Sequence, residues 1–374
     1  MILKQFEYSE FINDEKFWAI KPFELGRINL FAAKNATGKS RTLKAISWLS
    51  IMIKDNIFND NANYTVEFSD NSESYKYILT NDNKKVVSEK LVGNTETLLQ
   101  RHDTGKGEMF TEEFDRNIEF QLPGKKLAIS RRDLIQYPYL EKIHLWAESV
   151  QYYSFGTSMK QEYGKTLSDD DTTLHGKSDN SVEVFVVGEL EFDNEFKKNV
   201  LTSMNNIGYD LNAIDVAHGL YSNPNVRSED YTLFASENDR GAIVTQNAMS
   251  QGMFRALSII IHLTYHTMMG MPTTILIDDI GEGLDFDRST KLIKLLIELA
   301  EENDNIQLIM STNDRYVMNN VPFKYWQLID RKGGECKVYN YQNEKEKFDE
   351  FKYMGLNNFD FLATDYINSE WKKA

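Results

Sequence analysis

The stretch Ala33-Lys34-Asn35-Ala36-Thr37-Gly38-Lys39-Ser40 decides the fold class of this 374-residue chain. The β-prone run Arg27–Ala32 precedes it, and a segment with apolar residues spaced as on one helix face follows it. A phosphate-binding loop requires this strand–loop–helix order. Small residues in such a loop let backbone N–H groups face phosphate oxygens at the positive end of a helix. The sequence therefore predicts a nucleotide site here.

Within this loop, Lys39 is expected to neutralise the β- and γ-phosphates, and the Ser40 hydroxyl to reach Mg²⁺. Ala33 stands where the pattern GxxxxGK[ST] has its first glycine. If that position needs a positive φ, alanine costs roughly 1–2 kcal/mol; otherwise the change is harmless. An ordinary Gly-Lys-Ser turn before a helix is the alternative interpretation at this point.

A second feature is the apolar run Thr273–Asp279, which ends in two adjacent carboxylates. A buried strand would place Asp278 at its carboxyl end beside the phosphate loop, where α/β sheets bind ligands. Asp278 is then expected to hold Mg²⁺ through water, and Asp279 to orient the attacking water. A strand followed by an acidic turn is the alternative in so acidic a chain.

A third feature is the segment Met249–Arg255, which lies at the start of a predicted helix, Ser250–His266. Ser250 and Gly252 at a helix N-terminus form a second anion-binding corner. One chain has no use for two such corners on one nucleotide unless the corners come from different subunits.

With these motifs in this order, the chain resembles the ABC-type ATPase heads, and among them the soluble SMC-like and OLD-like AAA group rather than the transporters. The resemblance covers roughly residues 1–80 and 236–330. It implies an α/β P-loop NTPase with an ABC-ATPase-like mixed sheet flanked by helices, an N-terminal antiparallel β subdomain and an inserted α+β region. The four elements that carry it are Ala33–Ser40, Ser250–Gly252, Ile275–Asp279 followed by Gly281–Asp285, and Met310–Asp314.

The resemblance also implies residue roles. Lys39 and Ser40 resemble the Walker A pair, Asp278 the Walker B magnesium ligand, and Asp285 the D-loop aspartate at a dimer seam. Asp279 stands where the family usually has a glutamate, and Asn313 where it has a switch histidine, so slow hydrolysis is expected. No Q-loop glutamine is identified. The expected ATP-binding residues are Asn35, Ala36, Thr37, Gly38, Lys39, Ser40, Arg41, Ser250, Gln251, Gly252 and Asp285, with Ser40 and Asp278 on Mg²⁺ and with Lys39, Asp279 and Asn313 catalytic.

The expected domain organisation is one ATPase head split by an insertion. Residues 1–90 would form the N-terminal half, 91–235 the insertion, and 236–374 the C-terminal half with an extension. Further elements are predicted as helices over Leu134–Trp146, Asn194–Asn205 and Arg288–Glu301, a strand over Ile306–Ser311, an exposed loop over Ser168–Asn180, and a hairpin around Lys332–Glu335.

Composition narrows the class of protein. The chain has 42 basic and 57 acidic residues, a net charge of −15, which argues against a broad DNA-coating role but leaves a local basic groove open. The single cysteine, Cys336, excludes an internal disulfide framework. The start of the chain is no signal peptide, and the run Leu257–Leu263 is far short of the ~20 residues that a membrane span requires. A cytoplasmic protein is expected.

Several other residues are interpreted as structural. Met268, Met269 and Met271 are expected to fill the core or a turn rather than to bind a metal. His262 and His266 have helical spacing, but neither the glutamate of a zinc protease nor a third ligand is nearby. The basic residues Lys125, Lys126, Arg131 and Arg132 and the acidic residues Glu344, Glu346, Asp349 and Glu350 are expected to be solvated.

The leading hypothesis is a switch that binds ATP and Mg²⁺, assembles as a homodimer or higher homo-oligomer, and controls a separate effector protein. The stretch after Asp285 is too short for the TOPRIM domain of OLD-like nucleases, so any nuclease is expected on another chain. An analogy at family level suggests the sensors of bacterial anti-phage systems. The alternatives are a non-hydrolysing scaffold stabilised by nucleotide and an SMC-like DNA-repair head; a transporter subunit is disfavoured.

Overall fold

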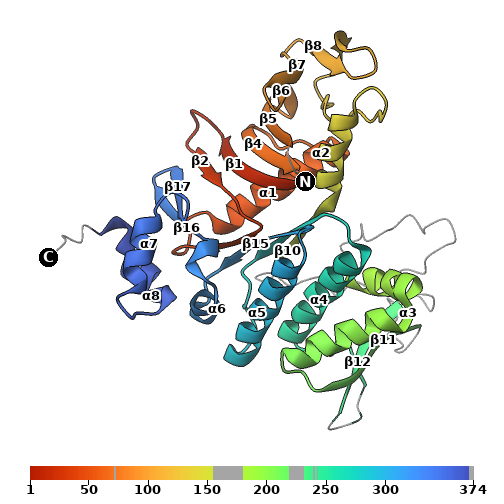
Figure 1. The fold of residues 1–374 in the computed structure, drawn as a ribbon, viewed down its shortest axis with the longest axis vertical. Helices are drawn as coiled ribbons and strands as arrows, with labels where there is room; N and C mark the ends of the chain where they lie inside the picture. The colour runs from red at the N-terminus through yellow and green to blue at the C-terminus, as the bar shows by residue number, and fades with distance from the viewer. Residues whose placement is uncertain (71–72, 155–179, 219–230, 239–240, 242, 370–374) are drawn as a thin grey trace.

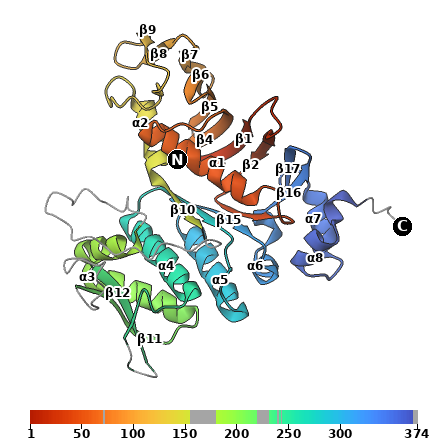
Figure 2. The ribbon, with the colours of Figure 1, turned by 180° about the vertical axis from the view of Figure 1, so that it is seen from behind.

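The computed structural model describes residues 1–70, 73–154, 180–218, 231–238, 241 and 243–369. A 14-stranded sheet runs through them, with helices on both faces (Figure 1 and Figure 2). Its centre is parallel, and β3, β14 and β15 are buried along their whole length, as strands covered on both faces are. In spatial order the parallel strands are β10 (Val150–Ser154), β14 (Thr273–Asp278), β15 (Ile306–Thr312), β3 (Ile28–Ala32) and β16 (Trp326–Lys332).

The sheet continues beyond β16 in a mainly antiparallel part. Buried and less buried residues alternate along β4 and β5, so that one face packs and the other is more open. We call β4 to β9 the β arm; it rises to the top of Figure 1. The strands, in spatial order, are β17 (Glu335–Asn340), β2 (Trp18–Glu24), β1 (Ile2–Glu10), β4 (Ala62–Asp70), β5 (Glu73–Asp82), β6 (Lys85–Gly93), β7 (Glu96–Arg101), β8 (Lys106–Thr111) and β9 (Arg116–Gln121).

Two hydrophobic clusters lie on opposite faces of the sheet. The alternation of side chains along β3 separates them, because Leu30 joins one cluster and Phe31 the other. One face carries α1 (Lys39–Asp55) and α2 (Pro138–Ser149). The other carries α3 (Ser181–Asn206), α4 (Gln251–Met269), α5 (Phe286–Glu302), α6 (Arg315–Asn320), α7 (Lys345–Lys352) and α8 (Asn358–Ala363), with short 3₁₀ turns at Phe323–Tyr325 and Tyr366–Asn368.

Helix α4 is the most deeply buried helix described here. The sequence predicts one apolar face for it, but every residue from Gly252 to His266 is buried. The sheet, α3 and neighbouring segments surround it, and a separate three-stranded sheet packs on α3. That small sheet consists of β11 (Leu211–His218), β12 (Tyr231–Glu237) and β13 (Ile243–Thr245).

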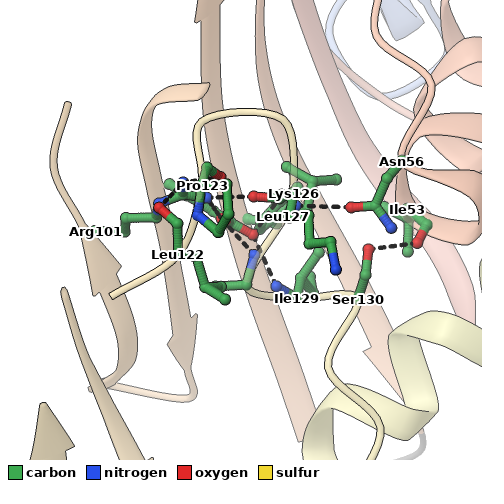
Figure 3. A network of polar contacts seen from close by, with 12 residues as sticks. Ile53, Asn56, Arg101, Leu122, Pro123, Lys126, Leu127, Ile129 and Ser130 are labelled. Atoms are coloured by element: carbon green, nitrogen blue, oxygen red, sulfur yellow. Dashed lines mark hydrogen bonds and ion pairs between the residues drawn. The ribbon is translucent and has the colours of Figure 1, made fainter. Parts of the chain in front are cut away.

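A buried polar network fastens the β arm to α1 (Figure 3). Arg101, at the end of β7, donates hydrogen bonds to the backbone oxygens of Lys126, Leu122 and Pro123. Glu89 of β6, which is fully buried, accepts from the N–H groups of Ala128 and Ile129 at 2.8 Å each and pairs with Arg101. Burial raises the pKa of Glu89.

The same loop is anchored to the end of α1. The Leu127 N–H donates to Asn56, and the Ser130 hydroxyl donates to the Ile53 carbonyl (Figure 3). Because these bonds join residues more than 70 positions apart, the position of the β arm depends on tertiary contacts rather than on local sequence.

The structure confirms the predicted fold class and corrects two element boundaries. Helix α2 begins at Pro138, not Leu134, because the Asp133 carboxylate accepts from the N–H groups of Ile135 and Gln136 and holds this stretch as a turn. The predicted Asn194–Asn205 helix is the second part of the longer α3, which has a non-helical residue at Asp193 (φ 50°).

Other expectations have varied outcomes. The hairpin around Lys332–Glu335 joins β16 to β17. The predicted loop Ser168–Asn180 lies, except for its last residue, outside the described residues. The domain division stays a prediction; residue 90 falls within β6, and β10 belongs to the main sheet. Among the described residues, no helix is long and apolar enough to cross a membrane.

Candidate nucleotide-binding site

A cavity of about 570 Å³ lies where the loop after β3 meets the loops after β14 and β15. These are the carboxyl ends of neighbouring parallel strands, where open α/β sheets bind ligands. The cavity brings together six consecutive residues of the predicted phosphate loop, Arg41 directly after them, and two residues from the other strand ends. Its lining consists of Trp18, Asn35, Ala36, Thr37, Gly38, Lys39, Ser40, Arg41, Asp279, Asn313 and Arg331.

The loop backbone adopts two left-handed residues, Gly38 (φ 113°) and Ala36 (φ 61°). At Gly38 a side chain is excluded twice, because its φ disfavours one and a Cβ would lie 2.9 Å from the Trp18 ring. Ala33 has no positive φ, so its replacement of glycine is harmless at that position. The backbone strain falls on Ala36 instead, where it costs roughly 1–2 kcal/mol.

The start of α1 has free backbone donors. Gly38 is its N-cap without a side-chain cap, and the N–H groups of Gly38, Lys39 and Ser40 donate to no described residue. The rest of the loop is held from outside: Arg331 donates to the Ala36 carbonyl at 3.0 Å, and the Cys336 thiol contacts the Thr37 carbonyl at 3.2 Å. Free N–H groups on a fixed loop at a helix N-terminus match an anion such as phosphate.

Lys39 is 5% exposed and points into this corner. Its ammonium donates to the Ala33 carbonyl at 3.0 Å and to Oδ1 of Asn313 at 2.6 Å. Burial lowers its pKa, and the nearby carboxylates of Asp279 and Asp278 oppose that shift. The Lys39 ammonium is therefore held next to Asp279, after β14, and Asn313, after β15, which the sequence analysis had placed at these strand ends.

The two carboxylates differ in environment. Asp278 is 4% exposed, does not line the cavity, and accepts from the hydroxyls of Ser311 at 2.6 Å and Tyr152 at 3.1 Å. Asp279 lines the cavity, has φ 56°, and accepts from the Asn313 amide at 3.2 Å. Burial raises the pKa of Asp279, and Asp278 adds to the rise.

The oxygen atoms of Ser40 and Asp278 are of the kind that binds a magnesium ion. Mg²⁺ prefers oxygen ligands, usually one or two protein groups together with water and substrate phosphates. The Ser40 hydroxyl is one such group, and the buried Asp278 carboxylate, held in place by two hydroxyls, is another.

The predicted signature residues lie elsewhere. Ser250 caps α4, accepting from the Met253 N–H at 3.2 Å, and both Ser250 and Gln251 are exposed. Gly252 is buried against the loop after β14, where a Cβ would lie 2.3 Å from the Gly283 carbonyl. Within the described part of the chain, none of the three lines the Lys39 cavity.

Asp285 is also outside that cavity. It is an exposed N-cap of α5 that accepts from the Arg288 N–H and pairs with the Arg288 guanidinium at 2.8 Å; the backbone hydrogen bond and then the guanidinium charge lower the pKa of its carboxyl. The segment between Asp279 and Asp285 joins the two regions, since Gly283 contacts Gly252 and the Glu282 carbonyl accepts from Arg255.

Four residues of the site were not singled out from the sequence: Trp18, Tyr152, Ser311 and Arg331. Ser311 lies inside the stretch Met310–Asp314 that carries the resemblance, so its position was available. Trp18 from β2 and Arg331 from the β16–β17 hairpin reach the phosphate loop only through long-range strand pairing, and Tyr152 from β10 reaches Asp278 in the same way. No local pattern marks them.

A family model described as "AAA domain, putative AbiEii toxin, Type IV TA system" matches residues 34–319, from the phosphate loop to α6. The chain belongs to this AAA family. No curated protein matches the chain. The predicted resemblance is thus confirmed at the level of family and fold: the chain carries a P-loop AAA domain that has the fold of an SMC head.

Two solved structures similar to this AAA domain have low sequence identity to it, and the first shares its fold. An SMC head bound to the C-winged helix domain of ScpA has a TM-score of 0.53 and 13% identity, over 92% of this chain and 99% of that one. An SMC head domain with an extended coiled coil, bound to the C-terminal domain of ScpA derived from Pyrococcus furiosus, has a TM-score of 0.49 and 13% identity, over 95% and 99%.

Proposed function

We propose that this AAA domain binds ATP with Mg²⁺ at the Lys39 cavity, hydrolyses it slowly, and acts as a switch whose closed state is a dimer of heads around the nucleotide. The observation that carries the proposal is one chain of contacts. Asn313 accepts from the Lys39 ammonium at 2.6 Å and donates to Asp279 at 3.2 Å, so cation, amide and carboxylate converge beside the free N–H groups of α1.

Each group has a defined task in this proposal. Phosphate oxygens replace the Ala33 carbonyl as the acceptor for Lys39. Ser40 and Asp278 would hold Mg²⁺, which would supply further neutralisation of phosphate charge. Asp279 holds the attacking water, and its partly buried carboxylate is a better base than an exposed one because its pKa is raised. Asn313 fixes the distance between Lys39 and Asp279 but cannot titrate near neutral pH.

The second half of the site comes from another head. Ser250 and Gln251 are exposed at the start of α4, and Asp285 and Phe286 are exposed at the start of α5. Gly252 joins the two helix starts through its contact with Gly283. A symmetric pair of heads would place each α4 corner on the γ-phosphate bound by the other, which supports an isologous dimer.

Control of a separate partner protein is the remaining part of the proposal. The net charge of −15 favours a partner with a basic face. The similar SMC head carries the C-winged helix domain of ScpA, which supports partner binding as a use of this fold. A role in bacterial anti-phage defence, by way of a separate effector, belongs to this proposal as an analogy.

ATP binding by Lys39→Ala tests the first step, because Lys39 is the buried cation of the cavity. We expect ATP affinity to fall at least ~100-fold, since a buried charge pair contributes on the order of 3 kcal/mol. Lys44→Ala is the matched control, an exposed lysine one turn further along α1. Unchanged affinity in Lys39→Ala would overturn the assignment of the site.

A non-hydrolysing scaffold is the second candidate function. Asp279 and Asn313 stand where the family usually has glutamate and histidine, so binding without turnover is consistent with the site. Phosphate release separates the two candidates. A purified protein that binds ATP and dimerises, but releases no phosphate with or without its partner, is the scaffold.

A further inference from the structure

A second cavity, of about 630 Å³, lies at the opposite end of the same strands. It opens where β10 and β14 begin and where α2 and α4 end, so it is separated from the nucleotide site by the length of β14. We call it the amino-end cavity. Its lining is Met1, Asp70, Lys142, Leu145, Trp146, Glu148, Ser149, Gln151, His266, Met269, Met271, Pro272 and Thr273.

Gln151 is the polar group that points to a ligand. It is 4% exposed and lines the cavity, and its carboxamide forms no hydrogen bond with any described residue. Most side-chain amides that are this little exposed are hydrogen-bonded, so an amide that lines a cavity without a protein partner is available to a ligand. An incoming amide or similar group would satisfy both its donor and its acceptor.

His266 adds a second unpaired group to the same wall. It is 4% exposed, and neither ring nitrogen bonds to a described residue. Burial lowers its pKa to about 4, so the ring is neutral near pH 7 and adds no charge to the cavity wall.

The rest of the wall favours an uncharged ligand. Trp146, Leu145, Met269, Met271 and Pro272 supply a largely apolar surface, and methionines adapt readily to the shape of a guest. The charges at the rim are already paired: Lys142 with Glu73 and Asp70, and Glu148 with Arg132 and His144. A charged ligand would have to break one of these pairs.

We propose that the amino-end cavity binds a small, uncharged, mainly aromatic molecule that carries an amide-like group, with Gln151 pairing to that group. Such a molecule would touch the far ends of three elements of the nucleotide site. Gln151 adjoins Tyr152, which donates to Asp278; Thr273 begins the strand that ends at Asp278; and His266 lies on the helix that starts after Ser250. The position fits a regulatory ligand, a consequence that rests on the proposed function.

The binding test uses naphthalene-2-carboxamide as the probe and calorimetry or ligand-observed NMR as the measurement. We expect saturable binding to the nucleotide-free full chain, and at least tenfold weaker binding of naphthalene-2-carboxylate, which has the same shape but a charge. Gln151→Met, which keeps the volume and removes the amide, should weaken probe binding about tenfold. Leu145→Glu, at the half-exposed mouth, should do the same, whereas Leu190→Glu, an exposed leucine on α3, should not.

No saturable binding, or wild-type binding by both Gln151→Met and Leu145→Glu, would overturn the site. The regulatory consequence has its own readout, the ATP affinity with and without saturating probe. A shift of threefold or more supports it, and an unchanged affinity removes it while leaving the binding site intact. Loss of ATP binding in the absence of probe would instead count against the proposed function.

Discussion

The N-termini of α1 and α4 are the two corners of one chain to which the proposed function assigns nucleotide phosphates, and they differ in what surrounds them. The α1 corner opens into a cavity whose walls include Lys39, Asp279 and Asn313. The α4 corner has an exposed serine as its cap, and none of its residues lines that cavity. The first corner has the Lys39 ammonium within its own chain, whereas the second has Ser250 and Gln251 exposed and Gly252 buried. The difference supports a site that two heads complete together.

Asp279→Asn is the largest expected effect, because it removes the base while leaving a side chain of the same size. We predict that ATP hydrolysis falls ~10²–10⁴-fold, the usual contribution of a general base, while ATP binding is retained and a nucleotide-bound dimer accumulates. Phosphate release and light scattering measure the two outcomes. Asp287→Asn, an exposed carboxylate on α5, is the control. Normal turnover in Asp279→Asn would remove that residue from the base role.

Gly252→Ala should break the α4 corner without touching the α1 corner. An added Cβ would lie 2.3 Å from the Gly283 carbonyl, so the α4 start and the loop after β14 must separate. We predict weaker ATP-dependent dimerisation, by about tenfold or more, as steric strain of 1–3 kcal/mol implies, with monomer ATP affinity little changed. Gly124→Ala, where a Cβ makes ordinary contacts, is the control. Equal dimerisation in both variants would contradict a role for this corner.

Asn313→Ala tests how much the amide between Lys39 and Asp279 contributes to the site at the start of α1. It deletes the amide between Lys39 and Asp279 and so leaves the cation with backbone acceptors alone. We predict roughly a tenfold loss in the rate of hydrolysis, the scale of one charge-assisted hydrogen bond of 1.5–3 kcal/mol that is partly replaced by water. Steady-state phosphate release measures it. Asn319→Ala, an exposed residue on α6, should have wild-type turnover.

The smallest effect concerns the buried body of α4. Burial lowers the pKa of His266 from 6.5 to about 4, so the folded state keeps this ring neutral while the unfolded chain takes up a proton. Stability from this group is therefore complete above pH 6.5 and declines as the pH falls toward 4. His266→Leu should flatten that decline by a few degrees of melting temperature between pH 6.5 and 4. An equal fall in the melting temperatures of the variant and the wild type between pH 6.5 and 4 would contradict this prediction.

The site was predictable to the extent that its residues lie in short motifs. Asp279 directly follows β14, and Gly38 and Lys39 lie where the loop after β3 passes into α1, so the strand and helix patterns fix their positions. The sequence also predicted that alanine at position 33 would be harmless unless that position needed a positive φ. In the structure the positive φ is at Ala36 and not at Ala33. The sequence did not predict three residues of the site, because each reaches it from a strand distant in sequence: Trp18, Tyr152 and Arg331.

The sequence by itself determined the phosphate loop at the start of α1, the order in which the motifs follow the parallel strands, and the P-loop fold class. Local chemistry is sufficient there, since a glycine-containing turn, a helix start and a buried strand each leave a short pattern. Only the tertiary structure decided the β arm fastened through Glu89 and Arg101, the all-round burial of α4, and the amino-end cavity with its unpaired Gln151. These depend on which distant surfaces meet, and burial and pairing of that kind are properties of the folded chain rather than of any stretch of it.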